Sequence, residues 1–139
     1  MPAWVLEGVL ATSPRPGYTP GPEHRVPAAT VDDWVDAARA FGIASVICLL
    51  DEDQLWLYRK SLPGGLIARY RKAGFEVAHI PTLDQQTHPF TEAQYEAAWE
   101  AFQSLPQPVL VHCSAGHDRT GRIVNHILGR LAGADGAIE

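Results

Sequence analysis

A cysteine and an arginine lie close together near the end of the chain, with five residues between Cys113 and Arg119. The apolar run 109–111 before the cysteine indicates a buried strand, and the pattern after the arginine indicates a helix. A loop that joins a strand to a helix can turn its N–H groups inward and form a nest for an oxyanion. The helix N-terminus adds positive charge, and a guanidinium can bind two oxygens at once. These residues therefore predict an anion site with a thiol at its base, in a positive field that favours the reactive thiolate.

The two side chains have complementary roles toward a phosphoryl group. Cys113 would attack phosphorus and form a covalent thiophosphoryl intermediate. Arg119 would bind the phosphoryl oxygens and stabilise the charge that spreads over them in the transition state. An inert buried cysteine and a surface ion pair are the ordinary alternatives, and the position of both residues at one strand–loop–helix junction disfavours them. The backbone N–H groups of the loop would complete the phosphate site, in Ser114, Ala115, Gly116, His117, Asp118 and Arg119.

Three neighbouring residues are predicted to support this loop. Thr120 can donate its hydroxyl to the sulfur, cap the following helix, or do both. Gly116 permits a backbone conformation that other residues resist. His112 is expected to hold the loop through hydrogen bonds rather than to act as a general base.

The segment His112-Cys113, followed by five residues and Arg119-Thr120-Gly121, resembles the signature of the cysteine-dependent protein tyrosine phosphatases. The strand–loop–helix pattern around it makes the match more specific than a cysteine–arginine pair alone. The compact chain looks most like the dual-specificity branch. The resemblance implies a phosphatase that hydrolyses phosphotyrosine, and also phosphoserine or phosphothreonine, through a cysteinyl-phosphate intermediate. It implies no cofactor, and a phosphorylated protein or a phosphoinositide as partner.

A leaving alkoxide or phenolate needs a proton, so this reaction requires a general acid. Asp84 is the first candidate, in a polar loop after a predicted strand and 29 residues (113 − 84) before Cys113. Dual-specificity phosphatases place their acid in a comparable loop. There the aspartate is often followed by glycines, whereas Gln85 and Gln86 follow here. A solvated loop aspartate is the alternative interpretation.

Asp118 competes for the same role. Phosphoinositide-directed relatives and some bacterial lipid and tyrosine phosphatases carry aspartate directly before the loop arginine, so an acid within the loop could replace or assist Asp84. The alternative is that Asp118 only holds the loop through hydrogen bonds. His117 stands where some lipid phosphatases have lysine, and it would add positive charge for a second phosphate. A phosphoinositide phosphatase is therefore the alternative function that the resemblance implies.

Cys48 lies near the end of a second apolar run and is first interpreted as a core residue. Some relatives carry a second cysteine at the end of the corresponding strand, where it forms a protective disulfide with the nucleophile. The resemblance thus implies a possible redox partner for Cys113, a resolving thiol that traps the sulfenic acid formed by peroxide.

Two other functions use similar residues. A rhodanese-type sulfurtransferase also has a cysteine loop before a helix, but the Arg119-Thr120-Gly121 ending and a separate acid loop favour a phosphatase. A non-catalytic phosphate-binding module is disfavoured because nucleophile, arginine and hydroxyl are all present. No metal is predicted, because the six histidines show no convincing ligand spacing.

Apolar and polar patterns predict the elements that position these residues. Strands alternate with helices, and the run 43–50 is almost continuously apolar, as in a strand buried on both faces. We therefore predict an α/β fold with a central, mostly parallel sheet flanked by helices, which resembles the three-layer architecture of cysteine phosphatases. In such sheets the site lies beyond the C-terminal ends of the strands. The expected strands are 43–50, 75–80 and 109–112, with a hairpin or bent strand over 4–11. The expected helices start near Thr30, near Leu66, near Thr91 and after the 113–119 loop, and the last of them ends near Gly133.

Residues 12–30 contain five prolines and two glycines and are expected to form an irregular surface loop. Four of its side chains can rim a substrate cleft, although a solvated position is the plainer interpretation of each. They are Arg15, Tyr18, His24 and Arg25.

The composition indicates a soluble globular chain and argues against several classes of partner. Its 139 residues suffice for one phosphatase-like domain, residues 1–139. The resemblance implies a further helix here, which leaves open whether the native chain extends past Glu139. The formal net charge of -5 gives no support for nucleic-acid binding. No apolar run approaches the roughly 20 residues that span a bilayer. Two distant cysteines and the lack of a signal-peptide pattern favour a cytoplasmic, reducing setting.

Overall fold

The strands form one mixed sheet, in which the order is β1-β2-β5-β3-β4. The computed structural model describes residues 2–83 and 90–138, the last five by their backbone alone. The first pair is antiparallel and the other three pairs are parallel, which confirms the predicted mostly parallel sheet. The strands are β1 (Ala3–Leu6), β2 (Leu10–Ser13), β3 (Ser45–Cys48), β4 (Glu76–His79) and β5 (Val109–His112).

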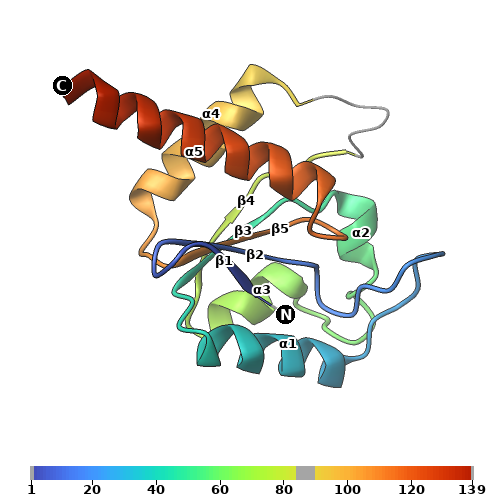
Figure 1. The fold of residues 1–139 in the computed structure, drawn as a ribbon. Coiled ribbons are helices and arrows are strands. Elements are labelled where there is room, and N and C mark those ends of the chain that lie inside the picture. The colour runs from blue at the N-terminus through green and yellow to red at the C-terminus, as the bar shows by residue number, and fades with distance from the viewer. Residues whose placement is uncertain (1, 84–89, 139) are drawn as a thin grey trace.

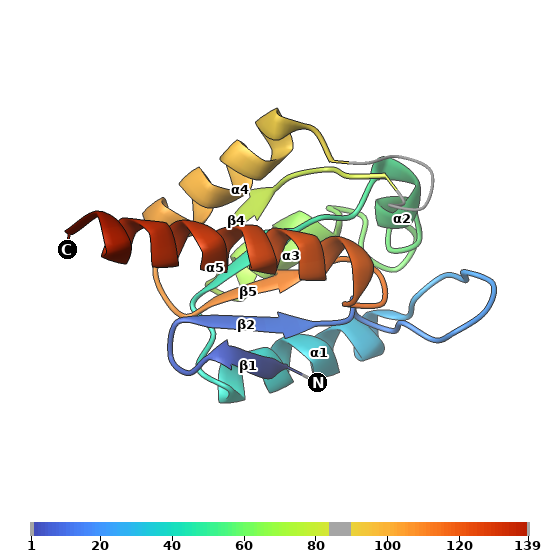
Figure 2. The ribbon, with the colours of Figure 1, turned by 45° about the horizontal axis from the view of Figure 1, so that its top comes forward.

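Helices cover both faces of this sheet and complete three layers (Figure 1). On one face lie α1 (Ala28–Ala40) and α3 (Leu66–Lys72), and on the other lie α4 (Glu92–Ser104) and α5 (Asp118–Ile138). The short helix α2 (Glu52–Trp56) follows β3 and stands at the edge where the parallel strands end (Figure 2).

The core explains why the central strands are apolar at most positions. Side chains of a strand point alternately to its two faces. In β3, Val46 and Cys48 pack toward α1 and α3, whereas Ile47 packs toward α4 and α5. In β5, Leu110 packs toward α1 and α3, and Val111 packs toward α4 and α5. Because both faces are covered, neither strand has a solvent-facing side, and polar residues are few in both.

Two predicted helix starts, near Leu66 and Thr91, agree with the structure, whereas one predicted start and one predicted end differ. Thr91 caps α4 as predicted, since Gln94 N donates to Thr91 Oγ1 at 3.1 Å and Thr91 N donates to Gln94 Oε1 at 2.9 Å. The predicted start of α1 at Thr30 is wrong, because the helix begins at Ala28 and Pro27 precedes it with φ -65°. Proline is favourable at a helix start because its missing N–H would have no partner there. The predicted stop near Gly133 is also wrong, because α5 continues to Ile138. A glycine within a helix lowers its stability by only about 1 kcal/mol, so Gly133 does not end α5.

The C-terminal ends of the parallel strands bring several connections to one edge of the sheet (Figure 2). The proline-rich loop leaves β2 at this edge, α2 follows β3, and the 113–119 loop joins β5 to α5. Residues far apart in the chain can therefore meet here. None of the helices described spans enough apolar residues to cross a membrane.

Candidate active site

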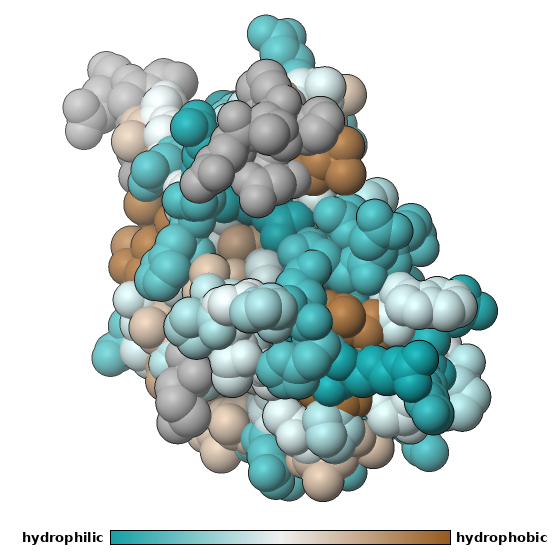
Figure 3. Space-filling model, turned by 90° about the vertical axis from the view of Figure 1, so that its right-hand side faces the viewer, coloured by the Kyte–Doolittle hydropathy of each residue, from teal (hydrophilic) through white to brown (hydrophobic). Residues whose placement is uncertain are grey.

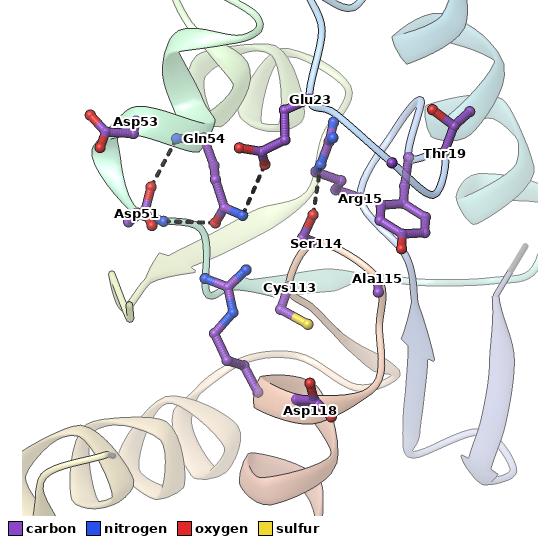
Figure 4. A pocket seen from close by; sticks show the side chains of 13 residues that line it. Arg15, Thr19, Glu23, Asp51, Asp53, Gln54, Cys113, Ser114, Ala115 and Asp118 are labelled. Carbon is purple, nitrogen blue, oxygen red and sulfur yellow. Dashed lines mark hydrogen bonds between the residues drawn. The ribbon is translucent and has the colours of Figure 1, made fainter. Parts of the chain in front are cut away.

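Cys113 lies where β5 ends, at a cavity of about 390 Å³. The residue is 2% exposed, and in Figure 4 its side chain lies among those of Ser114, Ala115 and Asp118, which line the same cavity. Within the described part of the chain, the N–H groups of 114–118 donate to no other protein group. Unpaired N–H groups beside a thiol form the kind of nest that binds an oxyanion.

Arg119 also lines this cavity and is held by main-chain oxygens. Its Nη1 donates to the carbonyl oxygen of Thr82 at 2.8 Å and to that of Leu49 at 3.4 Å. These two residues follow the ends of β4 and β3, so the sheet itself orients the guanidinium. The side chain forms no ion pair among the residues described, which leaves its positive charge available to an anion in the cavity.

Gly116 allows the 113–119 loop to approach the end of β2. Its φ is +82°, and a Cβ there would lie 2.9 Å from the backbone of Ser13 and Pro14. Residues with a side chain rarely adopt this φ, and the backbone contact leaves no room for one. The predicted conformational reason for a glycine is confirmed.

Arg15 is a site residue that the sequence pattern did not separate from its neighbours. It is only 2% exposed, and its Nε donates to Ser114 Oγ at 3.0 Å. Its backbone N donates to Ser114 O at 2.9 Å, and its Nη1 donates to Tyr58 Oη at 3.2 Å. Both Arg15 and Tyr18 line the cavity, whereas His24 and Arg25 do not. Arg15 therefore links the proline-rich loop to the 113–119 loop.

His112 is fully buried beneath the loop with both ring nitrogens paired. Its Nδ1 lies 2.9 Å from Cys113 O, and its Nε2 lies 2.9 Å from Tyr70 Oη. Since a carbonyl only accepts, Nδ1–H donates to Cys113 and Nε2 accepts from Tyr70. Burial lowers the pKa of His112 to about 4. A neutral ring with two hydrogen bonds can hold the start of the loop, and it has no free nitrogen to act as a base.

The buried, neutral state of His112 predicts a loss of stability in acid. Its pKa falls from 6.5 when exposed to about 4 in the fold, so its contribution is complete above pH 6.5 and is lost as the pH falls through 4. Between about pH 7 and about pH 4, the wild type should lose roughly 3 kcal/mol more unfolding free energy than His112→Gln. Urea denaturation of both proteins across this range measures the difference.

Parallel pH curves for the two proteins would contradict this expectation. A direct check that needs no variant is NMR titration of the His112 ring in the native protein, which should stay neutral well below the range of an exposed histidine.

The remaining predicted residues are placed differently around the cavity. Thr120 is fully buried, and its Oγ1 has no hydrogen-bond partner among the residues described, so its donation to the sulfur stays a prediction. Asp118 is exposed and lines the cavity; His117 is exposed and does not. Asp84 lies outside the described residues.

No three His, Cys, Asp or Glu side chains within the described ranges gather closely enough to hold a metal ion.

Cys48 lies beside the site but faces another layer. It pairs in register with His112, and both cysteines are free. Its side chain packs on the α1 and α3 face, whereas Cys113 packs with α4 and α5. Burial raises the pKa of Cys48 to about 12, so the thiol stays protonated, and thiols react slowly in that form. A redox partnership with Cys113 stays a prediction.

Comparison with known protein families identifies a match. A family described as the tyrosine phosphatase family matches residues 60–138, which include the whole 113–119 loop. Among proteins of curated function, none matches the sequence.

Solved structures show the same fold at low identity. Tk-PTP in its active form has a TM-score of 0.54 and 22% identity, over 84% of this chain and 64% of that one. Kinase associated phosphatase, with its catalytic cysteine replaced by serine, has a TM-score of 0.65 and 20% identity, over 88% and 65%. The core catalytic domain of a PP-IP phosphatase from S. cerevisiae, with citrate, has a TM-score of 0.51 and 16% identity, over 88% and 61%. The chain thus spans less than two thirds of each of these proteins.

Proposed function

The chain belongs to the tyrosine phosphatase family, and on that basis we propose that it hydrolyses phosphomonoesters through a cysteinyl-phosphate intermediate. Phosphotyrosine is the proposed substrate group, with phosphoserine and phosphothreonine as further ones. The observation that supports this most directly is the position of Cys113 in a cavity that Arg119 also borders, next to loop N–H groups that have no partner among the described residues.

The first proposed step transfers the phosphoryl group to sulfur. The thiolate of Cys113 attacks phosphorus, a P–S bond forms, and the P–O bond to the leaving group breaks. Arg119 and the N–H groups of 114–119 bind the three non-bridging oxygens, where negative charge gathers in the transition state. The leaving oxygen takes a proton from a general acid and departs as an alcohol or phenol.

The second proposed step regenerates the enzyme. Water attacks phosphorus, the same acid residue now accepts a proton from that water, and the P–S bond breaks to release inorganic phosphate. The hydroxyl of Thr120, which is buried beside the loop and has no partner among the residues that the structure describes, would donate to the departing thiolate. Stabilising the thiolate in this way makes the sulfur a better leaving group.

We propose Asp84 as the general acid, from its position in the sequence after β4, and Asp118 as the competing candidate, because it lines the cavity. The purified protein should hydrolyse p-nitrophenyl phosphate, with a rate that falls at high pH as the acid loses its proton. Replacing the true acid should remove this basic limb of the pH–rate profile. Profiles of Asp84→Asn and Asp118→Asn, each the control of the other, identify the residue that provides the proton.

Two results would contradict the proposal. One is a wild-type protein that neither hydrolyses the aryl phosphate nor binds vanadate. The other is transfer of sulfur from thiosulfate to cyanide at a higher rate than phosphate release, which would identify a rhodanese-type sulfurtransferase instead.

A phosphoinositide or inositol phosphate is the second candidate substrate. It is favoured by Asp118 directly before Arg119, and by the fold shared with a PP-IP phosphatase.

A further inference from the structure

The charges that line the cavity differ between its interior and its mouth. In the interior lie the arginines Arg15 and Arg119, which are 2% and 6% exposed. The remaining charged side chains of the lining are all carboxylates, and they are exposed or half-buried. They are Glu23 from the proline-rich loop, Asp51 and Asp53 at the start of α2, and Asp118 at the start of α5 (Figure 4).

No ion pair among the described residues involves these four carboxylates. The ion pairs found among the described residues join other side chains, on the α1–α3 and α4–α5 surfaces. Two of the four carboxylates accept uncharged donors instead: Glu23 from Gln54 Nε2 at 3.3 Å, and Asp51 from Gln54 N at 2.8 Å. The side of the molecule that carries α2 is mostly hydrophilic (Figure 3). The mouth of the cavity therefore presents a negative field to an approaching substrate.

The interior cations are matched to one phosphoryl group. Arg119 lines the same cavity as Cys113. The guanidinium of Arg15 already donates to Ser114 and Tyr58, which fixes it to the loop. His117, the other candidate for a second phosphate, does not line the cavity. A further phosphate on the substrate would meet the carboxylates of the mouth rather than a cation.

We propose that the substrate is a phosphorylated protein segment with lysine or arginine on both sides of the phosphorylated residue. This inference rests on the proposed function and names its substrate class. The phosphoryl group binds at Cys113 and Arg119, and the flanking cations lie against the carboxylates of the mouth. The same carboxylates repel polyanions, so inositol polyphosphates and phosphoinositide headgroups are poor substrates. The carboxylates of the mouth thus favour cationic peptides by attraction and disfavour polyanions by repulsion.

Two phosphotyrosine peptides of equal length test the proposal, one with lysines and one with glutamates on both sides of the phosphotyrosine. The wild type should show a kcat/KM roughly tenfold or more higher for the lysine peptide at low salt. Raising the ionic strength from about 0.02 M to about 0.5 M should reduce this ratio, because salt screens exposed charges.

A charge-neutralising variant and a matched control test whether the peptide preference arises from the carboxylates at the mouth of the cavity. Glu23→Gln combined with Asp53→Asn should reduce the ratio by about threefold or more. Asp33→Asn combined with Asp36→Asn makes the same change in net charge on the exposed surface of α1, away from the cavity lining. The control should leave the ratio as in the wild type.

Several outcomes would overturn the inference. They are equal or reversed peptide preference, an equal effect of both double variants, and faster phosphate release from an inositol polyphosphate or a phosphoinositide vesicle than from the lysine peptide. Turnover of p-nitrophenyl phosphate separates the two claims. With turnover but no charge preference, only this inference fails, and without any turnover the proposed function fails with it. Binding of both peptides to Cys113→Ser repeats the comparison independently of catalysis.

Discussion

Replacing Cys113 with serine is expected to lower the turnover of an aryl phosphate by roughly 10⁴-fold or more. A serine hydroxyl stays protonated at neutral pH and lacks the nucleophilicity of a thiolate. Among the described residues that line the cavity, Cys113 is the only thiol. The variant should still bind a phosphorylated peptide, because Arg119 and the loop N–H groups are unchanged. Initial rates and equilibrium binding of the same substrate measure both effects.

Cys48→Ser is the matched control for this prediction. It makes the same chemical change in the other free cysteine, which lies on the opposite face of the sheet. Burying a hydroxyl in that apolar layer costs stability, about 1–3 kcal/mol, so circular dichroism must confirm that the protein is folded. Turnover per folded molecule should stay within about threefold of the wild type. A Cys113→Ser variant with turnover close to that of the control would show that sulfur is not the nucleophile.

Arg119→Lys is expected to lower kcat by about 10²- to 10⁴-fold, although the positive charge is retained. A lysine ammonium cannot bind two phosphoryl oxygens with the parallel N–H groups of a guanidinium. It also cannot bridge the carbonyl oxygens of Leu49 and Thr82 while reaching toward the phosphate, as the Arg119 fork can. The loss should appear mainly in kcat, because the charge being stabilised is greatest in the transition state.

Arg130→Lys makes the same substitution on the exposed surface of α5. Arg130 pairs with Glu96 at 2.6 Å, and its side chain is 41% exposed. A surface pair of this kind contributes about 1 kcal/mol or less, so the turnover of this variant should stay within about twofold of the wild type. Steady-state kinetics on one phosphotyrosine peptide compare the two variants. Equal activity of Arg119→Lys and Arg130→Lys would mean that the guanidinium of Arg119 is not used in the reaction.

The sequence by itself was sufficient for features that depend on neighbours along the chain. The spacing of Cys113 and Arg119, at the end of an apolar strand and the start of a helix, predicted the loop that the structure contains. The continuous apolar runs predicted strands buried on both faces, and Thr91 predicted the start of α4. These features follow from side-chain periodicity and capping, which act over a few residues.

Only the tertiary structure showed which distant residues complete the site. Arg15 and Ser114 are 99 positions apart, and they meet because β2 lies parallel to β5 with Ser13 opposite His112. No local sequence pattern indicates that strand pairing, so the sequence did not distinguish Arg15 from the exposed residues of its loop. The carbonyls that hold Arg119 and the carboxylates at the mouth likewise come from separate connections at one sheet edge. Strand order decides such contacts, and strand order depends on how all the elements pack together, not on the residues adjacent in sequence.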